Sequence, residues 1–221
     1  MYLDIALIPD EIAWAATILA AIGLAALVRT AEWRALVVPL RQHLVLGSLL
    51  GLVALWMISV RTFDGLWLHL LGVTAVTLLI GLRFTLMVGA IACGVHALLI
   101  EQPLAGAPVA WLVNVVVPAG VTRLLVQWLS ERPQSNLFIY LLGAGFGGGV
   151  LASFALVAAS LFILSMAGQT SYVSGALENW PMIALIAFPE GFINGMILSV
   201  IVVLNPEAVK NFDSDKYLGE G

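Results

Sequence analysis

The sequence predicts an all-α, polytopic membrane protein with about seven transmembrane helices. Hydrophobic residues make up 62% of the 221 residues and charged residues only 10%, whereas a soluble domain carries about 25% charged residues. The mean hydropathy is +1.06. In addition, basic residues lie on alternate sides of the apolar segments, which is the pattern of loops on the two sides of a bilayer.

Seven apolar runs are long enough, or nearly so, to cross about 30 Å of hydrocarbon, which takes about 20 helical residues. They cover residues 11–28, 44–60, 66–80, 84–100, 109–128, 137–167 and 182–204. The third run is short, so we expect it to borrow its flanks or to sit in a sheltered position. The sixth is too long for one simple crossing, so we expect it to tilt or to emerge from the bilayer. Together they predict a single membrane domain over residues 1–221.

The distribution of Lys and Arg predicts the orientation of the chain. Only Arg61 falls on one side of the spans, whereas seven basic residues fall on the other: Arg29, Arg34, Arg41, Arg83, Arg132, Lys210 and Lys216. We therefore expect segment 1–10 outside and tail 205–221 in the cytoplasm, with the protein in the inner membrane. No basic tract is long enough to bind nucleic acid.

Polar side chains at depth point to function because they are costly in lipid. The outer halves of four spans carry His69, His96, Asn114, and the pair Glu190 and Asn194. Glu190 and Asn194 lie roughly 12 and 18 Å into the last span at about 1.5 Å per residue. One outward-facing polar pocket is the economical explanation, and we assign Glu190, Asn114 and Asn194 to substrate binding.

Glu190 is the strongest single signal, because a carboxylate inside a span must be protonated, paired or bound to a metal. It follows Pro189, whose ring and missing N–H free a carbonyl one turn earlier, so we expect an opened stretch of helix that lines a cavity. The other residues also have simpler explanations. His69 could be an interfacial imidazole bonded to a neighbouring carbonyl, His96 a structural group close to water, and Asn114 a link between two helices.

Small residues predict close helix packing in two spans. Five glycines open the sixth span, namely Gly143, Gly145, Gly147, Gly148 and Gly149. In the first span, Ala16 and Ala20 lie one turn apart and predict a face that docks a partner helix. GxSxG and HExxH motifs and Cys-rich clusters are absent from the sequence, so we expect no enzyme activity.

Three stretches of the chain resemble the CbiM-type proteins, the substrate-binding membrane subunits of energy-coupling factor transporters for cobalt and nickel. They are GLWLHLLG at 65–72, continuing to LIG at 79–81; WLVN at 111–114, followed by Pro118; and FPEG at 188–191, followed by the apolar run 193–203. The resemblance implies capture of a divalent metal from outside the cell. It also implies two kinds of partner, a transmembrane coupling protein and cytoplasmic ATPase subunits, beside the lipid bilayer.

The resemblance implies metal ligands as well. Such proteins use the terminal amine, here that of Met1, a histidine at position two, and a histidine that corresponds to His69. Position two of this chain is Tyr2, so one imidazole is missing and Asp4, His96 or the Tyr2 phenol would have to replace it. A nitrogen-rich site of this kind suits nickel or cobalt.

Three other classes of function stay open. An accessory or assembly subunit of another membrane complex is the first, because loss of a ligand can accompany loss of transport. Haem binding by His69 and His96, at similar predicted depth on adjacent antiparallel spans, is the second. An intramembrane hydrolase is the third. A co-purifying ATPase module would indicate a transporter, and a Soret band would indicate haem.

Overall fold

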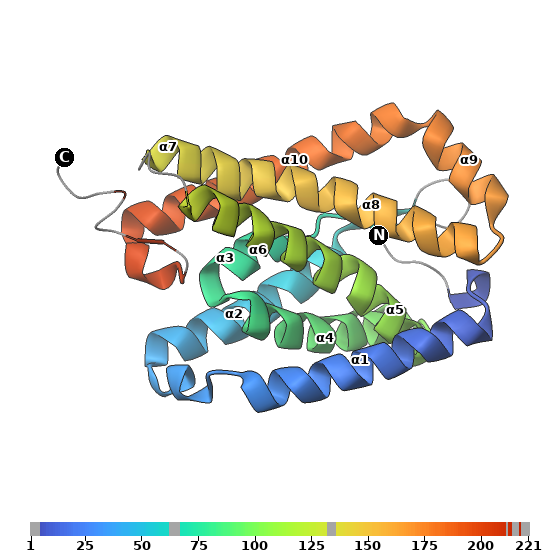
Figure 1. Ribbon diagram of the computed structural model, residues 1–221, viewed down its shortest axis with the longest axis horizontal. Coiled ribbons are helices and arrows are strands. Elements are labelled where there is room, and N and C mark those ends of the chain that lie inside the picture. Colours follow the sequence, from blue (N-terminus) through green and yellow to red (C-terminus); the bar gives the residue numbers. More distant parts are fainter. Residues whose placement is uncertain (1–4, 62–66, 132–135, 211, 214–216, 218–221) are drawn as a thin grey trace.

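The structure is a computed structural model that describes residues 5–61, 67–131, 136–210, 212–213 and 217. Its long helices run side by side along the long axis of the molecule (Figure 1). In the described residues, six helical runs are long and apolar enough to cross a membrane: Asp10–Thr30, Pro39–Met57, Leu82–Leu99, Leu104–Ser130, Leu137–Met166 and Trp180–Leu204. The all-α class and six of the predicted spans are confirmed by length and composition, although the second begins at Pro39, before its predicted start.

Four of the spans are single helices: α1 (Asp10–Thr30), α2 (Pro39–Met57), α4 (Leu82–Leu99) and α10 (Trp180–Leu204). The other two are composite. One joins η4 (Leu104–Gly106), α5 (Ala107–Trp111), the π-helical turn η5 (Leu112–Val116) and α6 (Val117–Ser130); the other joins α7 (Leu137–Tyr140), the π-helical segment η6 (Leu141–Gly147) and α8 (Gly148–Met166). The remaining helical turns are η1 (Ile5–Leu7), η2 (Trp33–Val37) and η7 (Pro206–Ala208). Helix α9 (Thr170–Glu178), between α8 and α10, was not predicted because its sequence is too polar for a span.

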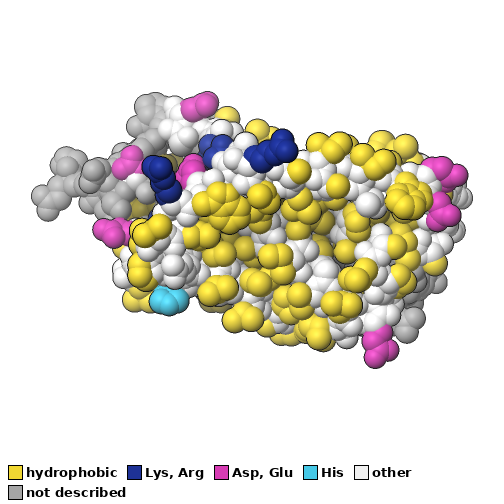
Figure 2. All heavy atoms as spheres, turned by 90° about the horizontal axis from the view of Figure 1, so that it is seen from below, with side chains coloured by type: hydrophobic (Ala, Val, Ile, Leu, Met, Phe, Trp, Pro, Cys, Tyr) yellow, Lys and Arg dark blue, Asp and Glu magenta, His cyan; other side chains and the backbone are white. Residues whose placement is uncertain are grey.

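The helix surfaces expose large hydrophobic side chains, as a lipid environment requires. On α1, Trp14 is 68% exposed and Ile22 is 64% exposed. Figure 2 shows one face of the molecule covered largely by hydrophobic side chains, with the charged side chains around its edges. This belt is what the hydropathy of the sequence predicts for a bundle whose outer surface faces hydrocarbon.

The third predicted span, residues 66–80, is not a membrane-crossing helix. Strands β1 (Ser59–Arg61) and β2 (Trp67–His69) form an antiparallel pair in which Ser59 lies opposite His69. The following helix, α3 (Val73–Ile80), has eight residues, all buried, so it is only about 12 Å long. It packs against α2, α4, α6, α8 and α10. The run is apolar because other helices of the protein surround it. This is the sheltered position that we expected for so short a run.

Glycines allow the sixth and seventh predicted spans to approach closely, as expected. A Cβ added to Gly149 would lie 2.9 Å from the Cα of Gly191, and one added to Gly145 would lie 2.8 Å from the Cα of Gly195. No side chain fits between the two helices at these points. Through this contact α8 and η6 pack closely against α10 along the stretch that carries Glu190, and the packing sets the position of that residue along the bundle.

Basic residues from separate elements gather at one end of the bundle. Arg83, the second residue of α4, and Lys210, after η7, lie 3.3 and 3.2 Å from the carboxylate of Glu32. The Arg41 guanidinium donates hydrogen bonds to the carbonyls of Leu79 and Ala208. Their gathering agrees with the pattern behind the predicted orientation, while the side of the membrane on which this end lies stays a prediction.

Candidate metal centre

Two buried imidazoles meet between β2 and α4. The ring centroids of His69 and His96 are 5.7 Å apart, and the two residues are 8% and 3% exposed. Trp56, near the end of α2, contacts both rings at centroid distances of 5.4 and 5.8 Å. The structure thus brings together the two histidines that the sequence assigned to metal binding. His69 comes from a strand, however, and not from the transmembrane helix that we predicted.

The tautomer of His69 follows from its hydrogen bond. Its Nδ1 lies 3.1 Å from the carbonyl oxygen of Leu70. A carbonyl oxygen can only accept, so Nδ1 carries the proton and the neutral ring has its lone pair on Nε2. The hydrogen bond to a neighbouring carbonyl that the simpler explanation of His69 predicted is therefore present. It is compatible with metal binding, because ligating histidines ordinarily donate their other N–H in this way.

Burial is the main factor that lowers the pKa of His69 well below its usual value; the residue lies outside the six span-length helices. The imidazole is therefore neutral at physiological pH. A metal ligand must be in this form, because protonation and metal binding compete for the same lone pair. Burial thus weakens the competition of protons with a metal ion for the His69 lone pair.

A second polar group lies beside the histidines, where α10 meets the start of α3. The Glu190 carboxylate accepts hydrogen bonds from the backbone N–H of Leu71 at Oε2 (2.6 Å) and of Gly72 at Oε1 (2.9 Å). The N-terminal N–H groups of a helix lack partners within the helix, and its dipole favours an anion there. Glu190 therefore caps the short helix that follows His69.

Asn194 completes this group from one turn further along α10. Its side-chain amide donates to Glu190 Oε1 at 2.6 Å, and its carbonyl oxygen accepts from the backbone N–H of Ala75 at 2.7 Å. Glu190 is 2% exposed and Asn194 is fully buried. Two helical side chains thus satisfy three N–H groups at the beginning of α3, where each unsatisfied group would cost about 1–3 kcal/mol.

The expected opened stretch at Pro189 is not present, because α10 is helical from Trp180 to Leu204 with Pro189 inside it. The buried carboxyl group of Glu190 is stabilised by hydrogen bonds from the backbone of Leu71 and Gly72 and from Asn194, and not by an unwound turn that lines a cavity. The assignment of Glu190 and Asn194 to substrate binding stays a prediction. Their hydrogen bonds show a contact with the loop of His69.

The other predicted site residues lie apart from these two groups or outside the described chain. Asn114 is 3% exposed in the π-helical turn η5, which packs against α4 and α8, and its substrate role stays a prediction. Ala16 and Ala20 are each 6% exposed, and their helix α1 packs against α4 and α5 of the same chain. Their role as a partner interface also stays a prediction. Met1 and Asp4 lie outside the described residues.

No three side chains of His, Cys, Asp or Glu stand close enough to hold a metal within the part of the chain that the structure describes. His69 and His96 can supply two nitrogen donors there. Sequence reasoning missed Trp56, whose indole Nε1 donates to the carbonyl of Leu71 at 3.0 Å. It also missed the turn at Gly72, which has a φ of 67°. The signal was present, because glycine after an apolar strand is typical of such a turn.

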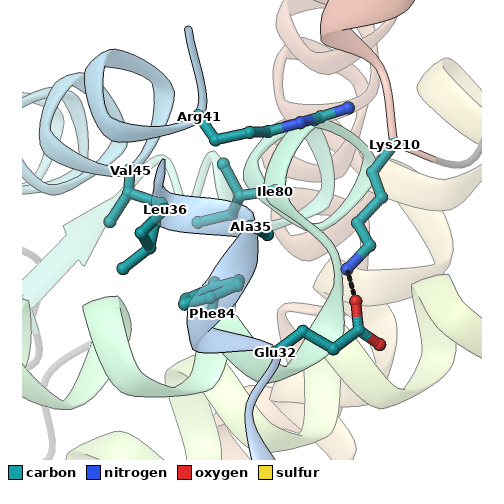
Figure 3. Close-up of a pocket in the computed structure, with 8 residues that line it drawn as sticks. All are labelled: Glu32, Ala35, Leu36, Arg41, Val45, Ile80, Phe84 and Lys210. Atoms are coloured by element: carbon teal, nitrogen blue, oxygen red, sulfur yellow. Dashed lines mark hydrogen bonds and ion pairs between the residues drawn. The ribbon is translucent and has the colours of Figure 1, made fainter. Parts of the chain in front are cut away.

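A separate cavity of about 230 Å³ lies at the other end of α3, where Ile80 contributes to its wall (Figure 3). Arg41 and Lys210 extend across it from different elements, and Lys210 pairs with Glu32. Its inner lining is apolar and includes Phe84, Val45 and Leu36. About 12 Å of helix separates this cavity from the histidines, so it is not part of the imidazole site.

The model of one protein family matches nearly the whole chain, from residue 4 to residue 208. The description of that family is "CbiM: Cobalt uptake substrate-specific transmembrane region". No curated protein matches the chain. The matched region contains all six span-length helices, both histidines and the Glu190–Asn194 pair. The chain therefore belongs to the CbiM family of cobalt uptake substrate-specific transmembrane regions.

Proposed function

We propose that this protein is the substrate-capture subunit of an energy-coupling factor type transporter, and that it binds a divalent first-row transition metal through His69 and His96. The observation that carries the proposal is the pair of buried imidazoles whose ring centroids lie 5.7 Å apart. Imidazole nitrogen is a donor that suits nickel, cobalt and zinc. Family membership supports cobalt as the first candidate.

The spacing of the two rings fits one shared ion. A metal about 2.1 Å from each ligating nitrogen places two ring centroids roughly 4.5 to 6.4 Å apart, for ligand–metal–ligand angles of about 90° to 180°. The observed 5.7 Å falls inside this range. In this proposal His96 supplies the imidazole that the family otherwise takes from position two, where this chain has Tyr2. The terminal amine of Met1 and the carboxylate of Asp4 are the proposed remaining donors.

We further propose that the protein works in the inner membrane with a transmembrane coupling protein and cytoplasmic ATPase subunits. Cobalt uptake against a gradient needs an energy source, and the sequence has no phosphate-binding loop of its own. The exposed apolar face of α1, with Trp14 and Ile22, is available for such a partner or for lipid. The basic end of the bundle is the proposed cytoplasmic end.

Elemental analysis of the detergent-purified protein tests the metal site. Cells are grown with trace cobalt, nickel and zinc, and the metal content is measured for the parent, His69→Ala, His96→Ala and His43→Ala. His43 is exposed on α2 and serves as the matched control. We expect about one metal per chain in the parent and the control, and loss of that metal when either buried imidazole is removed, because each would supply a ligating nitrogen.

Two results would contradict the proposal. Metal binding that survives His69→Ala would show that His69 is not a metal ligand. Absence of metal from the parent, together with co-purification of a complex that has no ATPase subunit, would favour the accessory or assembly role. The second result is checked by mass spectrometry of the proteins that co-purify from the native membrane.

A further inference from the structure

We infer that Glu190 is a positioning residue for His69, and that it acts through the single peptide unit between Leu70 and Leu71. This inference deepens the proposed function and rests on it for the role of His69 as a metal ligand. Glu190 itself does not touch the metal. It fixes the orientation of the peptide unit whose carbonyl accepts the hydrogen bond from the His69 imidazole.

The geometry consists of two hydrogen bonds on one peptide unit. The carbonyl oxygen of Leu70 accepts from His69 Nδ1 at 3.1 Å, and the N–H of Leu71 donates to Glu190 Oε2 at 2.6 Å. Both groups belong to the same planar unit, so fixing one end fixes the other. In a trans peptide the C=O and the N–H point in opposite directions. The imidazole and the carboxylate therefore lie at opposite ends of this unit.

Neighbouring contacts leave the peptide little freedom to rotate. The Trp56 indole donates to the next carbonyl, that of Leu71, at 3.0 Å. Gly72 donates to the other oxygen of Glu190 at 2.9 Å, in a left-handed backbone conformation where an added Cβ would meet the Leu55 side chain at 2.8 Å. The loop after His69 is thus held by side chains from α2 and α10. Of these, Glu190 is the one whose two carboxyl oxygens both accept backbone N–H groups.

The carboxylate also changes the strength of the hydrogen bond to His69. Hydrogen bonds in a chain polarise one another, and a short hydrogen bond from the N–H to a carboxyl oxygen makes the carbonyl at the other end of the peptide a better acceptor. A stronger acceptor at Nδ1–H makes Nε2 more basic and fixes the tautomer with its lone pair on Nε2. Glu190 thus favours the form of His69 that can bind a metal.

Imidazole NMR of the metal-free protein tests the inference without any transport measurement. The three histidines are labelled with ¹⁵N and assigned with His→Gln variants. In the parent we expect His69 to have a protonated Nδ1 and an unprotonated Nε2. In Glu190→Gln we expect the Nδ1–H of His69 to exchange with water at least about tenfold faster, with the second tautomer populated. The exposed Glu178→Gln variant, which also removes one carboxylate, is expected to match the parent.

Metal titration supplies the second arm of the test. We expect the affinity of Glu190→Gln for Co²⁺ to fall about 10- to 100-fold, as is typical when the partner of a ligating histidine is lost. The visible absorption of bound Co²⁺ should keep the band pattern of the parent, because the ligand set is unchanged. A changed band pattern would identify Glu190 as a direct ligand and overturn the positioning role.

The two arms separate failure of this inference from failure of the proposed function. If Co²⁺ binding depends on His69 but the His69 signals of folded Glu190→Gln equal those of the parent, the inference is wrong and the proposed function stands. If the His69 signals change but no metal binds to the parent, the contact is confirmed and the proposed function fails. If Glu190→Gln does not fold, Glu190→Asp keeps the carboxyl group but withdraws it by one methylene, and unchanged His69 signals in that variant would also overturn the inference.

Discussion

Glu190 and Asn194 lie one turn apart on α10 and are joined by a hydrogen bond of 2.6 Å between Oε1 and the side-chain amide. Each also accepts from a neighbouring backbone: Glu190 from Leu71 and Gly72, just before α3, and Asn194 from Ala75 in its first turn. The pair therefore joins a span-length helix to a short helix that cannot cross the membrane.

We expect Asn194→Leu to destabilise the protein by about 2–6 kcal/mol, because the change removes the acceptor of the Ala75 N–H and one of the donors to Glu190 Oε1, and each buried loss costs about 1–3 kcal/mol. Leucine has a similar volume, so packing changes little. Chemical denaturation in detergent micelles measures the effect. Asn179→Leu is the control, because Asn179 is exposed and its side-chain amide donates to the carbonyl of Gly175, one turn earlier in α9. Equal stability of the two variants would show that the junction carries no net energy.

We expect Gly149→Ala to push α8 away from α10. The new methyl group would lie 2.9 Å from the Cα of Gly191 and 3.0 Å from the carbonyl oxygen of Glu190, and overpacking of this kind costs about 1–3 kcal/mol. The matched control is Gly94→Ala on α4, where an added Cβ meets nothing within 4 Å and helix propensity gains up to about 1 kcal/mol. Thermal unfolding should therefore shift in opposite directions for the two variants. A rise for both would contradict the close contact.

We expect Arg41→Gln to loosen the segment that follows α10. The guanidinium bonds to the carbonyls of Leu79, Ala208 and Glu207 at 3.2, 3.1 and 3.0 Å, and a glutamine side chain is too short to replace this fork. Hydrogen exchange of the backbone amides at 208–210 should become about tenfold faster, since local opening would cost less. Arg34→Gln, which removes an exposed charge from the same end, should leave that exchange unchanged.

We expect the ion pairs of Glu32 to contribute to stability only above the ordinary pKa of a carboxyl group. The hydrogen bond and charge of Lys210, with a smaller contribution from Arg83, lower the pKa of Glu32 from 4.5. A lowered pKa in the folded state means that the stabilisation is present above pH 4.5 and is lost as the pH falls through the lower folded value. Both partners are exposed, so the effect is small and decreases with salt.

The measurement for Glu32 is the difference in melting temperature between the parent and Glu32→Gln as a function of pH. We expect a small positive difference at pH 6 to 8 that disappears at acidic pH and in high salt. A difference that persists below the pKa of Glu32 would assign the effect to packing of the side chain.

Apolar length by itself determined the six span-length helices. In each of them, outward-facing residues such as Trp14 and Ile22 are apolar because they face lipid, and a run of about 20 such residues has no other economical structure in a bilayer. The same rule failed for residues 66–80. Hydropathy cannot tell a residue that faces lipid from one enclosed by other helices, and all eight residues of α3 are enclosed.

Only the tertiary structure decided what the deep polar residues contact. The sequence showed that a carboxylate at position 190 needs a partner, since an unpaired charge in a span is costly. The partners are the backbone N–H groups of Leu71 and Gly72, which lie 119 and 118 residues earlier in the chain. Backbone donors have no signature in the sequence, because every residue except proline carries one. The burial of Ala16 and Ala20 and the meeting of His69 with His96 likewise depend on how helices and strands pack, which local patterns do not determine.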